Sequence, residues 1–239
     1  MQLKIPGSKS ISNRALLLAA LAQGTSVLHN LQISADILAM IDALRALGVS
    51  IELNQQSQTA RILGCNGNFP HRAAQINCYE SGTLARFMLV LCSGVAGIYH
   101  LDGASSLRKR PLSTQLKTLE QMGVNYSSDR LPLTIESTEV LAGGEIYADG
   151  SQTSQHISAL LMMAPFMKQS LILKAENSVS RPYIEMTCKM MQEFGVEVVS
   201  DPEGWCVFLP QYYQSREYEI ESDWSTAAYL LSAAALTSS

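Results

Sequence analysis

The chain has 239 residues, of which 47% are hydrophobic and 16% are charged, and its formal net charge is −4. This composition is typical of a globular protein with a large core and argues against a disordered chain. The negative balance argues against a nucleic-acid partner, and no apolar run reaches the roughly 18 residues of a membrane span. The five cysteines form no CxxC pair and the four histidines show no metal-ligand spacing, so we expect reduced thiols, no metal and a cytoplasmic protein.

A polar loop that opens straight into an apolar helix is the first informative segment. Residues 6–14 contain three serines, one lysine and one arginine, and the apolar run of residues 15–22 follows at once. The first four backbone N–H groups of a helix lack intrahelical partners, and the helix dipole adds partial positive charge there. With Lys9 and Arg14 close by, we expect this helix start to bind a phosphate or a carboxylate. The spacing does not match a nucleotide-binding P-loop, and the alternative is an ordinary capped helix with solvated charges.

Two kinds of predicted helix recur along the chain with a regular spacing. Nearly all-apolar helices, a pattern typical of buried helices, are expected at residues 14–22, 84–93 and 156–166. Amphipathic helices that each end in a Gly-Val pair are expected at residues 41–48, 116–123 and 188–195, and the pairs stand 75 and then 72 residues apart. The glycine supplies the left-handed cap that ends each helix. Short strands are expected at residues 26–29, 49–53, 60–63, 98–101, 124–126, 133–135, 171–173, 196–199 and 206–209.

The repeating unit therefore consists of helix, strand, helix, strand and strand. Three such units around one axis predict an α/β lobe with its apolar helices inside and its sheets outside. If a pseudo-threefold axis relates the units, the polar loops at residues 8–13, 80–83 and 151–155 lie at one end and form one anion-binding face. A fourth apolar helix is expected at residues 222–236, and left unpaired it would expose a large apolar face. We therefore expect the chain to be the front portion of a longer protein.

Five separated motifs resemble those of the 5-enolpyruvylshikimate-3-phosphate synthase family, which belongs to the enolpyruvyl transferases. The motifs are residues 6–10 with Asn13 and Arg14, residues 81–83 with Arg86, residues 107–111, residues 153–155 and residues 180–183. They follow the order and spacing of the N-terminal half of the family's members. Two alternatives are the sister enzyme UDP-N-acetylglucosamine enolpyruvyl transferase, which carries Lys-Asn where this chain has Lys9 and Ser10, and a non-catalytic module that binds phosphometabolites.

The resemblance implies a fold of two lobes, each an inverse α/β barrel of three βαββαβ-type units with buried helices and outer sheets. It also implies transfer of the enolpyruvyl group of phosphoenolpyruvate to the 5-hydroxyl of shikimate 3-phosphate, with release of phosphate and without a metal or organic cofactor. This is a step of the shikimate pathway to chorismate and the aromatic amino acids. The full-length protein is expected to be a monomer.

The implied organisation divides the chain between the two lobes. Residues 1–8 would belong with the second lobe, and residues 222–239 would begin it again after a crossover. The lobe that binds shikimate 3-phosphate would span residues 9–221, as repeats at about 9–80, 81–150 and 151–221.

The resemblance further implies which residues bind the substrates. Lys9 would contact both anionic substrates and take part in catalysis. Shikimate 3-phosphate would be bound by Ser10, Arg14, Thr153, Ser154, Gln155, Ser180 and Tyr183. Ser10 and Arg14 would bind the ring and its carboxylate. Thr153, Ser154 and Ser180 would bind the 3-phosphate. Gln155 and Tyr183 would lie beside the ring. Phosphoenolpyruvate would be bound by Gly82, Thr83 and Arg110, since the missing side chain of the glycine allows a close approach.

Each assignment has a plainer structural alternative. Arg14 and Arg86 could extend from buried helices only to reach solvent, and the charge run at residues 108–110 is typical of a solvated face. Residues 153–155 could be an ordinary N-cap, and Tyr183 could belong to the core.

The chain also departs from the family pattern. Glu80 stands where the family commonly has Asn, and Thr153 stands where Ser is usual. A carboxylate beside an anionic substrate is unfavourable unless it is turned away or paired, for instance with Arg86. The family's acid–base carboxylates come from the second lobe, and proton transfer needs such positioned groups. We therefore expect this chain alone to bind shikimate 3-phosphate weakly and not to turn over.

Overall fold

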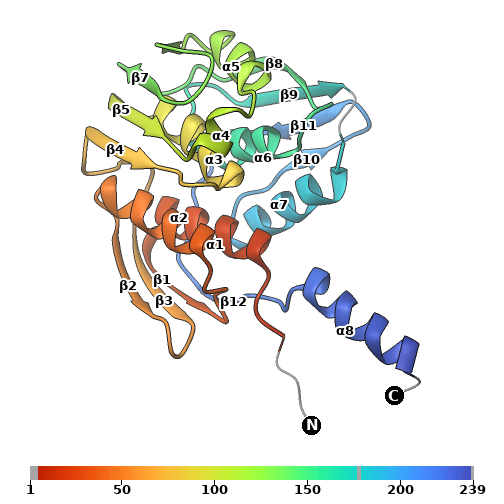
Figure 1. Ribbon diagram of the computed structural model, residues 1–239. Helices are drawn as coiled ribbons and strands as arrows, with labels where there is room; N and C mark the ends of the chain where they lie inside the picture. Colours follow the sequence, from red (N-terminus) through yellow and green to blue (C-terminus); the bar gives the residue numbers. More distant parts are fainter. Residues whose placement is uncertain (1–4, 177–178, 238–239) are drawn as a thin grey trace.

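Helices form the inside of one lobe and sheets form its outside, whereas the last helix extends away from it (Figure 1). The structure is a computed structural model that describes residues 5–176 and 179–237. The inverse arrangement, in which helices rather than strands fill the centre, confirms the fold expected from the repeats.

Three four-stranded sheets surround the helices, one for each repeat. The first, ordered β12-β1-β3-β2, consists of β1 (Gln23–His29), β2 (Ser50–Asn54), β3 (Thr59–Cys65) and β12 (Glu217–Glu219). The second, ordered β4-β5-β7-β6, consists of β4 (Ala73–Asn77), β5 (Gly97–Asp102), β6 (Asn125–Tyr126) and β7 (Leu133–Ser137). The third, ordered β10-β11-β9-β8, consists of β8 (Gly144–Asp149), β9 (Leu171–Glu176), β10 (Val199–Ser200) and β11 (Gly204–Val207).

The three nearly all-apolar helices are the buried ones, as the sequence predicts. They are α1 (Lys9–Leu21), α3 (Gly82–Ser93) and α6 (Gln155–Met163), the last continued by the 3-10 turn η1 (Ala164–Phe166). Eleven of the 13 residues of α1 are buried, because a helix that is apolar on all sides needs neighbours all round. The amphipathic helices are α2 (Ala35–Ala46), α5 (Ser113–Glu120) and α7 (Arg181–Glu193), and the short helix α4 (Ser105–Arg108) precedes α5.

The order of elements within a unit differs from the expected βαββαβ pattern. A strand that the sequence analysis missed precedes α3 and another precedes α6, so that the second and third units follow the order βαβαββ. The missed strands are β4, β8 and β12, which pair in parallel with β5, β9 and β1. A parallel pair needs a crossover, and α3 and α6 are the crossovers of the second and third units. These strands are short and contain few large apolar residues, which is why no clear apolar pattern marked them.

The missed strands also move the boundaries of the repeats. β4 and β8 belong to the second and third sheets although they lie before residues 81 and 151, the expected unit starts. The leading strand of the first sheet is β12, near the other end of the lobe, where Val27 pairs with Glu217. The first unit is thus closed by a segment from the end of the third.

Two segments that enter and leave the lobe lie side by side. The backbone N–H of Ser8 donates to the carbonyl of Glu221 at 2.8 Å, and that of Asp223 donates to the carbonyl of Pro6 at 2.8 Å. The helix α8 (Trp224–Thr237) follows, which confirms the predicted fourth apolar helix. Its side chains are mostly exposed, Trp224 at 74% for example. Assignment of these segments to a second lobe stays a prediction, and residues 1–4 lie outside the described residues.

No helix in the described ranges is both long enough and apolar enough to cross a membrane.

Candidate functional site

The polar starts of the three buried helices lie together at one end of the lobe. Ser8 caps α1 by accepting from the N–H of Ile11 at 3.5 Å, and Ser81 caps α3 by accepting from the N–H of Leu84 at 3.3 Å. In the loop before α6, the hydroxyl of Thr153 accepts from the N–H of Gln155 at 3.2 Å. These caps come from the serines and threonine that the sequence places just before each apolar run.

Side chains link the starts of α3 and α6 directly. The amide of Gln155 donates from Nε2 to Oγ1 of Thr83 at 2.9 Å, and its Oε1 accepts from Nη1 of Arg86 at 3.3 Å. Arg86 also donates from Nη1 to the carbonyl of Gly82 at 3.1 Å. The second and third loops therefore converge, as expected for units related by a pseudo-threefold axis.

Arg14 links the first loop to the third unit from a buried position. Its side chain is only 2% exposed. Nε donates to Oγ1 of Thr187 at 2.6 Å, and Nη2 donates to Oγ of Ser158 at 3.3 Å and to the carbonyl of Tyr183 at 3.4 Å. Nη1 donates to the carbonyl of Ser10 at 3.0 Å. All four acceptors are neutral.

No carboxylate in the described part of the chain forms an ion pair with Arg14. Burial of this guanidinium away from water lowers its pKa to about 10. A buried charge without a counter-ion is unfavourable unless something compensates it, and in the described residues Arg14 has only these four neutral acceptors.

A second group of positive charges surrounds Gly82 at the start of α3. A Cβ atom built on this glycine would lie 2.8 Å from Nη1 of Arg110 and 3.0 Å from Nη1 of Arg86. Burial, and then the charge of Arg110, lower the pKa of Arg86. Two like charges held close together, with no ion-pair partner among the described residues, favour an anion between them. Because Arg86 takes part in this cluster, the interpretation that it only reaches solvent is not supported.

Lys9 projects from the first turn of α1 and pairs with a residue that sequence reasoning missed. Its Nζ lies 3.1 Å from Oδ2 of Asp36, in the first turn of α2. The ammonium is half exposed, so it stays accessible to a ligand. One feature of the sequence could have pointed to Asp36, because an acid in the first turn of a helix complements the helix dipole. In the structure this position places a carboxylate at the end of the lobe where the three loops meet.

The remaining predicted residues lie at the starts of α6 and α7. Ser154 is the N-cap of α6 and is buried. Ser180 is the N-cap of α7 and has φ 57°, a left-handed conformation that is uncommon for a residue with a side chain. Tyr183 is 42% exposed, so the alternative that places it in the core does not hold, and its carbonyl contacts Arg14.

The carboxylate of Glu80 does not pair with Arg86. Its Oε1 accepts a hydrogen bond from Oγ of Ser106 in α4 at 3.2 Å. In the charge run, Arg108 forms a two-pronged bond to Asp102, with Nε to Oδ1 at 2.9 Å and Nη2 to Oδ2 at 2.6 Å. This pair is exposed and structural. Arg110 is therefore the arginine of the charge run that reaches Gly82 of α3.

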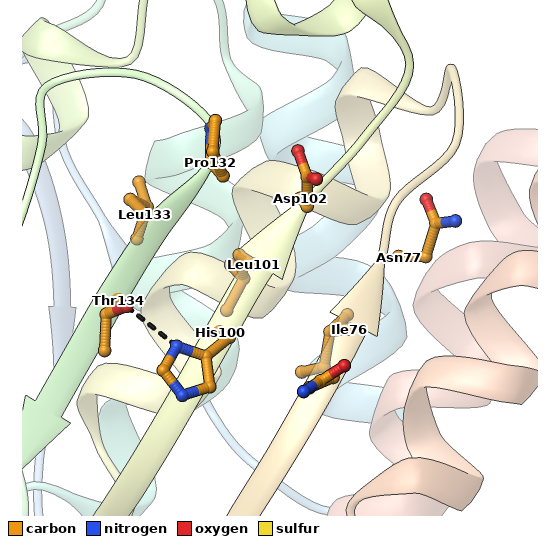
Figure 2. Close-up of a pocket in the computed structure, with 9 residues that line it drawn as sticks. Ile76, Asn77, His100, Leu101, Asp102, Pro132, Leu133 and Thr134 are labelled. Atoms are coloured by element: carbon orange, nitrogen blue, oxygen red, sulfur yellow. Dashed lines mark hydrogen bonds between the residues drawn. The ribbon is translucent and has the colours of Figure 1, made fainter.

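A hollow of about 570 Å³ lies elsewhere, on the outer face of the second sheet. Figure 2 shows His100 and Thr134 side by side on the neighbouring strands β5 and β7, with Asp102 at the end of β5. Nδ1 of His100 is hydrogen-bonded to Oγ1 of Thr134 at 2.8 Å, and Asp102 is held by an arginine. The hollow has no arginine or lysine in its lining, so it does not suit an anionic ligand. In the described ranges, no three His, Cys, Asp or Glu residues are grouped so that they could share a metal ion.

Comparisons with known proteins place the chain in a family. A family model described as EPSP synthase (3-phosphoshikimate 1-carboxyvinyltransferase) matches residues 1–239. The chain is 42% identical over 240 residues to a 3-phosphoshikimate 1-carboxyvinyltransferase of Nostoc punctiforme, covering 98% of this chain and 56% of the relative. It is 36% identical over 251 residues to a chloroplastic one of Arabidopsis thaliana, covering 98% of this chain and 48% of the relative.

The fold is similar to that of a solved EPSP synthase from Acinetobacter baumannii. The TM-score is 0.84 at 24% sequence identity, covering 96% of this chain and 51% of the other. The chain thus spans about half the length of the proteins it matches.

Proposed function

Because the chain belongs to the EPSP synthase family, we propose that it supplies the shikimate-3-phosphate half-site of an enolpyruvyl transferase. The proposed reaction moves the enolpyruvyl group of phosphoenolpyruvate to the 5-hydroxyl of shikimate 3-phosphate and releases phosphate. Support for the reaction comes from the relatives, which are named 3-phosphoshikimate 1-carboxyvinyltransferase. Support for the half-site comes from the convergence of positive charge and helix starts at one end of the lobe.

The buried guanidinium of Arg14 is the observation that carries the proposal. Its bonds all go to neutral oxygens, so its charge is available to a ligand carboxylate. A charge-assisted hydrogen bond contributes about 1.5–3 kcal/mol. We assign the shikimate carboxylate to Arg14, with Ser10 beside it in the first turn of α1.

The 3-phosphate is assigned to the third loop. Thr153, Ser154 and Ser180 stand at the starts of α6 and α7, where hydroxyls and unpaired backbone N–H groups favour an anion. Gln155 lies between this loop and Thr83 of the second loop, so it is placed to face both substrates, and Tyr183 lies one turn into α7.

Phosphoenolpyruvate is assigned to the cluster around Gly82. There Arg110 approaches the position that a side chain would fill, and two arginines supply charge for a phosphate or a carboxylate. Lys9 at the start of α1 is assigned to both substrates, because its ammonium is half exposed although it pairs with Asp36.

None of the described residues that we assign to the substrates is suited to be the general acid or base of the proposed reaction. Lys9 is a cation and the hydroxyls bind phosphate, so proton transfer needs groups from the remainder of the full-length protein. We propose that this remainder forms a second lobe that closes over the half-site. The exposed apolar side chains of α8 fit such a role, and the 239-residue chain alone is expected to bind without turnover.

Calorimetric titration of the 239-residue chain with shikimate 3-phosphate tests the proposal. Saturable binding that weakens at higher salt and is reduced in Lys9→Ala and Ser154→Ala is expected. Lys117→Ala, an exposed lysine of α5 outside the site, is the matched control and should bind normally. Absence of binding in a folded sample would overturn the half-site, and preference for a UDP-sugar would instead favour the sister enzyme.

A further inference from the structure

Two buried hydroxyls surround the guanidinium of Arg14, and the proposed binding roles leave both unused. Thr187 of α7 and Ser158 of α6 are each 0% exposed. The two hydroxyls are also bonded to one another, with the oxygens 2.9 Å apart. They belong to different helices, and Arg14 belongs to a third, so the group joins three elements of the lobe.

The position of these hydroxyls relates them to the proposed half-site. Ser158 lies one helical turn below Ser154, whose carbonyl accepts its N–H at 3.0 Å. Thr187 lies one turn below Tyr183, and its hydroxyl lies 2.8 Å from that residue's carbonyl. Each hydroxyl is thus directly beneath a residue that we assign to shikimate 3-phosphate.

The hydrogen bonds of the guanidinium leave it one free donor. Arginine has five N–H hydrogens, of which one on Nε, one on Nη1 and two on Nη2 have acceptors at 2.6–3.4 Å. The second hydrogen on Nη1 has no acceptor among the described residues. The plane of the guanidinium is fixed from both sides, while its charge is not neutralised.

We propose that Thr187 and Ser158 are positioning residues that orient Arg14 for the carboxylate of the acceptor substrate. A hydroxyl suits this task better than a carboxylate, because it accepts the N–H of Arg14 without cancelling the charge that the ligand needs. A flexible, unpaired arginine would lose more side-chain entropy on binding. The inference rests on the proposed function, in which Arg14 binds that carboxylate.

The test compares two ligands that differ only in the carboxylate. The 239-residue chain is titrated with shikimate 3-phosphate and with an analogue that carries a hydroxymethyl group in place of the carboxylate. Thr187→Val keeps the shape of the side chain and removes its hydroxyl. We expect it to lower the affinity for shikimate 3-phosphate about tenfold, the size of one charge-assisted hydrogen bond. The affinity for the analogue should change little. Thr187→Ser should restore binding.

Matched variants separate positioning from a general loss of structure. Thr118→Val removes another buried threonine hydroxyl, which donates to the carbonyl of Thr114 in α5 at 3.2 Å, and should leave both affinities unchanged. Ser158→Ala provides a second test at the same guanidinium if Thr187→Val does not fold.

The outcomes distinguish this inference from the proposed function. If Thr187→Val lowers the affinity for both ligands equally, or lowers neither affinity in a folded variant, the positioning role is overturned while the half-site stands. Failure of Thr187→Ser to recover binding also counts against it. If the unaltered chain binds neither ligand, the proposed function itself is wrong.

Discussion

Lys9 and Asp36 form an ion pair between the starts of α1 and α2, with Nζ 3.1 Å from Oδ2 and side chains that are 50% and 29% exposed. A pair this exposed contributes at most about 1 kcal/mol to folding. Its more important effect is local, because a fixed carboxylate beside the ammonium reduces the positive potential that an anionic ligand meets.

Replacing Asp36 by asparagine should therefore tighten anion binding and hardly change stability. We expect Asp36→Asn to bind shikimate 3-phosphate a few-fold more tightly at low salt, with a steeper salt dependence, because Lys9 is no longer neutralised. Calorimetry at two salt concentrations measures both effects. Asp42→Asn is the control on the same helix, since that residue pairs with Arg45 instead, at 3.8 Å. Weaker binding in Asp36→Asn would mean that Asp36 orients Lys9 for the ligand, and that this orientation affects binding more than the gain in positive electrostatic potential.

Gly82→Ala should separate binding from stability. The added Cβ would lie 2.8 Å from Nη1 of Arg110 and 3.0 Å from Nη1 of Arg86. Both contacts are with the flexible ends of side chains, which can move aside, and alanine in place of glycine at an unstrained position stabilises by about 0.4–1 kcal/mol because the unfolded chain is less free. We expect unchanged or higher stability, and a loss of about tenfold or more in the affinity for phosphoenolpyruvate or inorganic phosphate because the two arginines are displaced.

The contrasting control is Gly123→Ala. Gly123 has φ +83°, and no atom lies within 4 Å of the point that an added Cβ would occupy, so alanine there is strained but intrudes on nothing. It should lower stability by about 1 kcal/mol and leave the affinity for phosphate unchanged. Equal affinity in Gly82→Ala and the unaltered chain would contradict the placement of an anion at this glycine.

The sequence predicted the helices of the lobe well, because their patterns are strong. Each buried helix is a long apolar run that begins after capping hydroxyls, and each amphipathic helix ends at a glycine in the left-handed region, for instance Gly48 at φ +90°. β4, β8 and β12 could not be predicted in this way. They are held by backbone pairing with β5, β9 and β1 rather than by an apolar pattern of their own.

The candidate site was predicted in part, for similar reasons. Residues that belong to local motifs, such as Lys9 and Gly82, could be found from the chain alone. The pairing of Asp36 with Lys9 and that of Thr187 with Arg14 could not, since these contacts span 27 and 173 residues of sequence. The pairing of Glu80 with Ser106 also depends on how two loops meet in space.

His156 should make the stability of the lobe depend on pH. This side chain is buried, and its Nε2 has no hydrogen-bond partner in the described structure. Burial, and then the charge of Arg86, lower the pKa of His156 to about 4. The native state therefore holds the neutral imidazole, whereas the unfolded chain takes up a proton below pH of about 6.5. The contribution of His156 to the free energy of unfolding should be fully present above a pH of about 6.5, and the free energy should fall by about 3 kcal/mol as the pH approaches 4.

Denaturant unfolding at a series of pH values measures this dependence. His156→Leu should remove most of the slope in that window, because the protonation of the unfolded chain at this position is lost. His100→Gln, which alters an exposed histidine on β5, should keep the slope. A slope of the same size in His156→Leu would show that other groups cause the acid sensitivity.

Arg14→Met should raise or preserve stability while it weakens binding. The buried guanidinium costs desolvation free energy and has only neutral partners, and replacing a buried charge by an apolar side chain of similar length is often neutral or stabilising. Thr187 keeps an acceptor after the change, because its hydroxyl lies 2.8 Å from the carbonyl of Tyr183. The affinity for shikimate 3-phosphate should fall about ten- to a hundredfold, since the carboxylate loses its charged partner.

Arg14→Lys is the informative companion to this change. It keeps a positive charge but not the planar fork that bonds Ser158 and Thr187 together, so its affinity should lie between those of the unaltered chain and Arg14→Met. Unfolding and titration of the same samples give both quantities. A large loss of stability in Arg14→Met would mean that the arginine is kept for its hydrogen bonds to the three helices rather than for a ligand. The opposite movement of stability and affinity is what a preformed anion site requires, because the charge that destabilises the empty lobe is the one that the ligand neutralises.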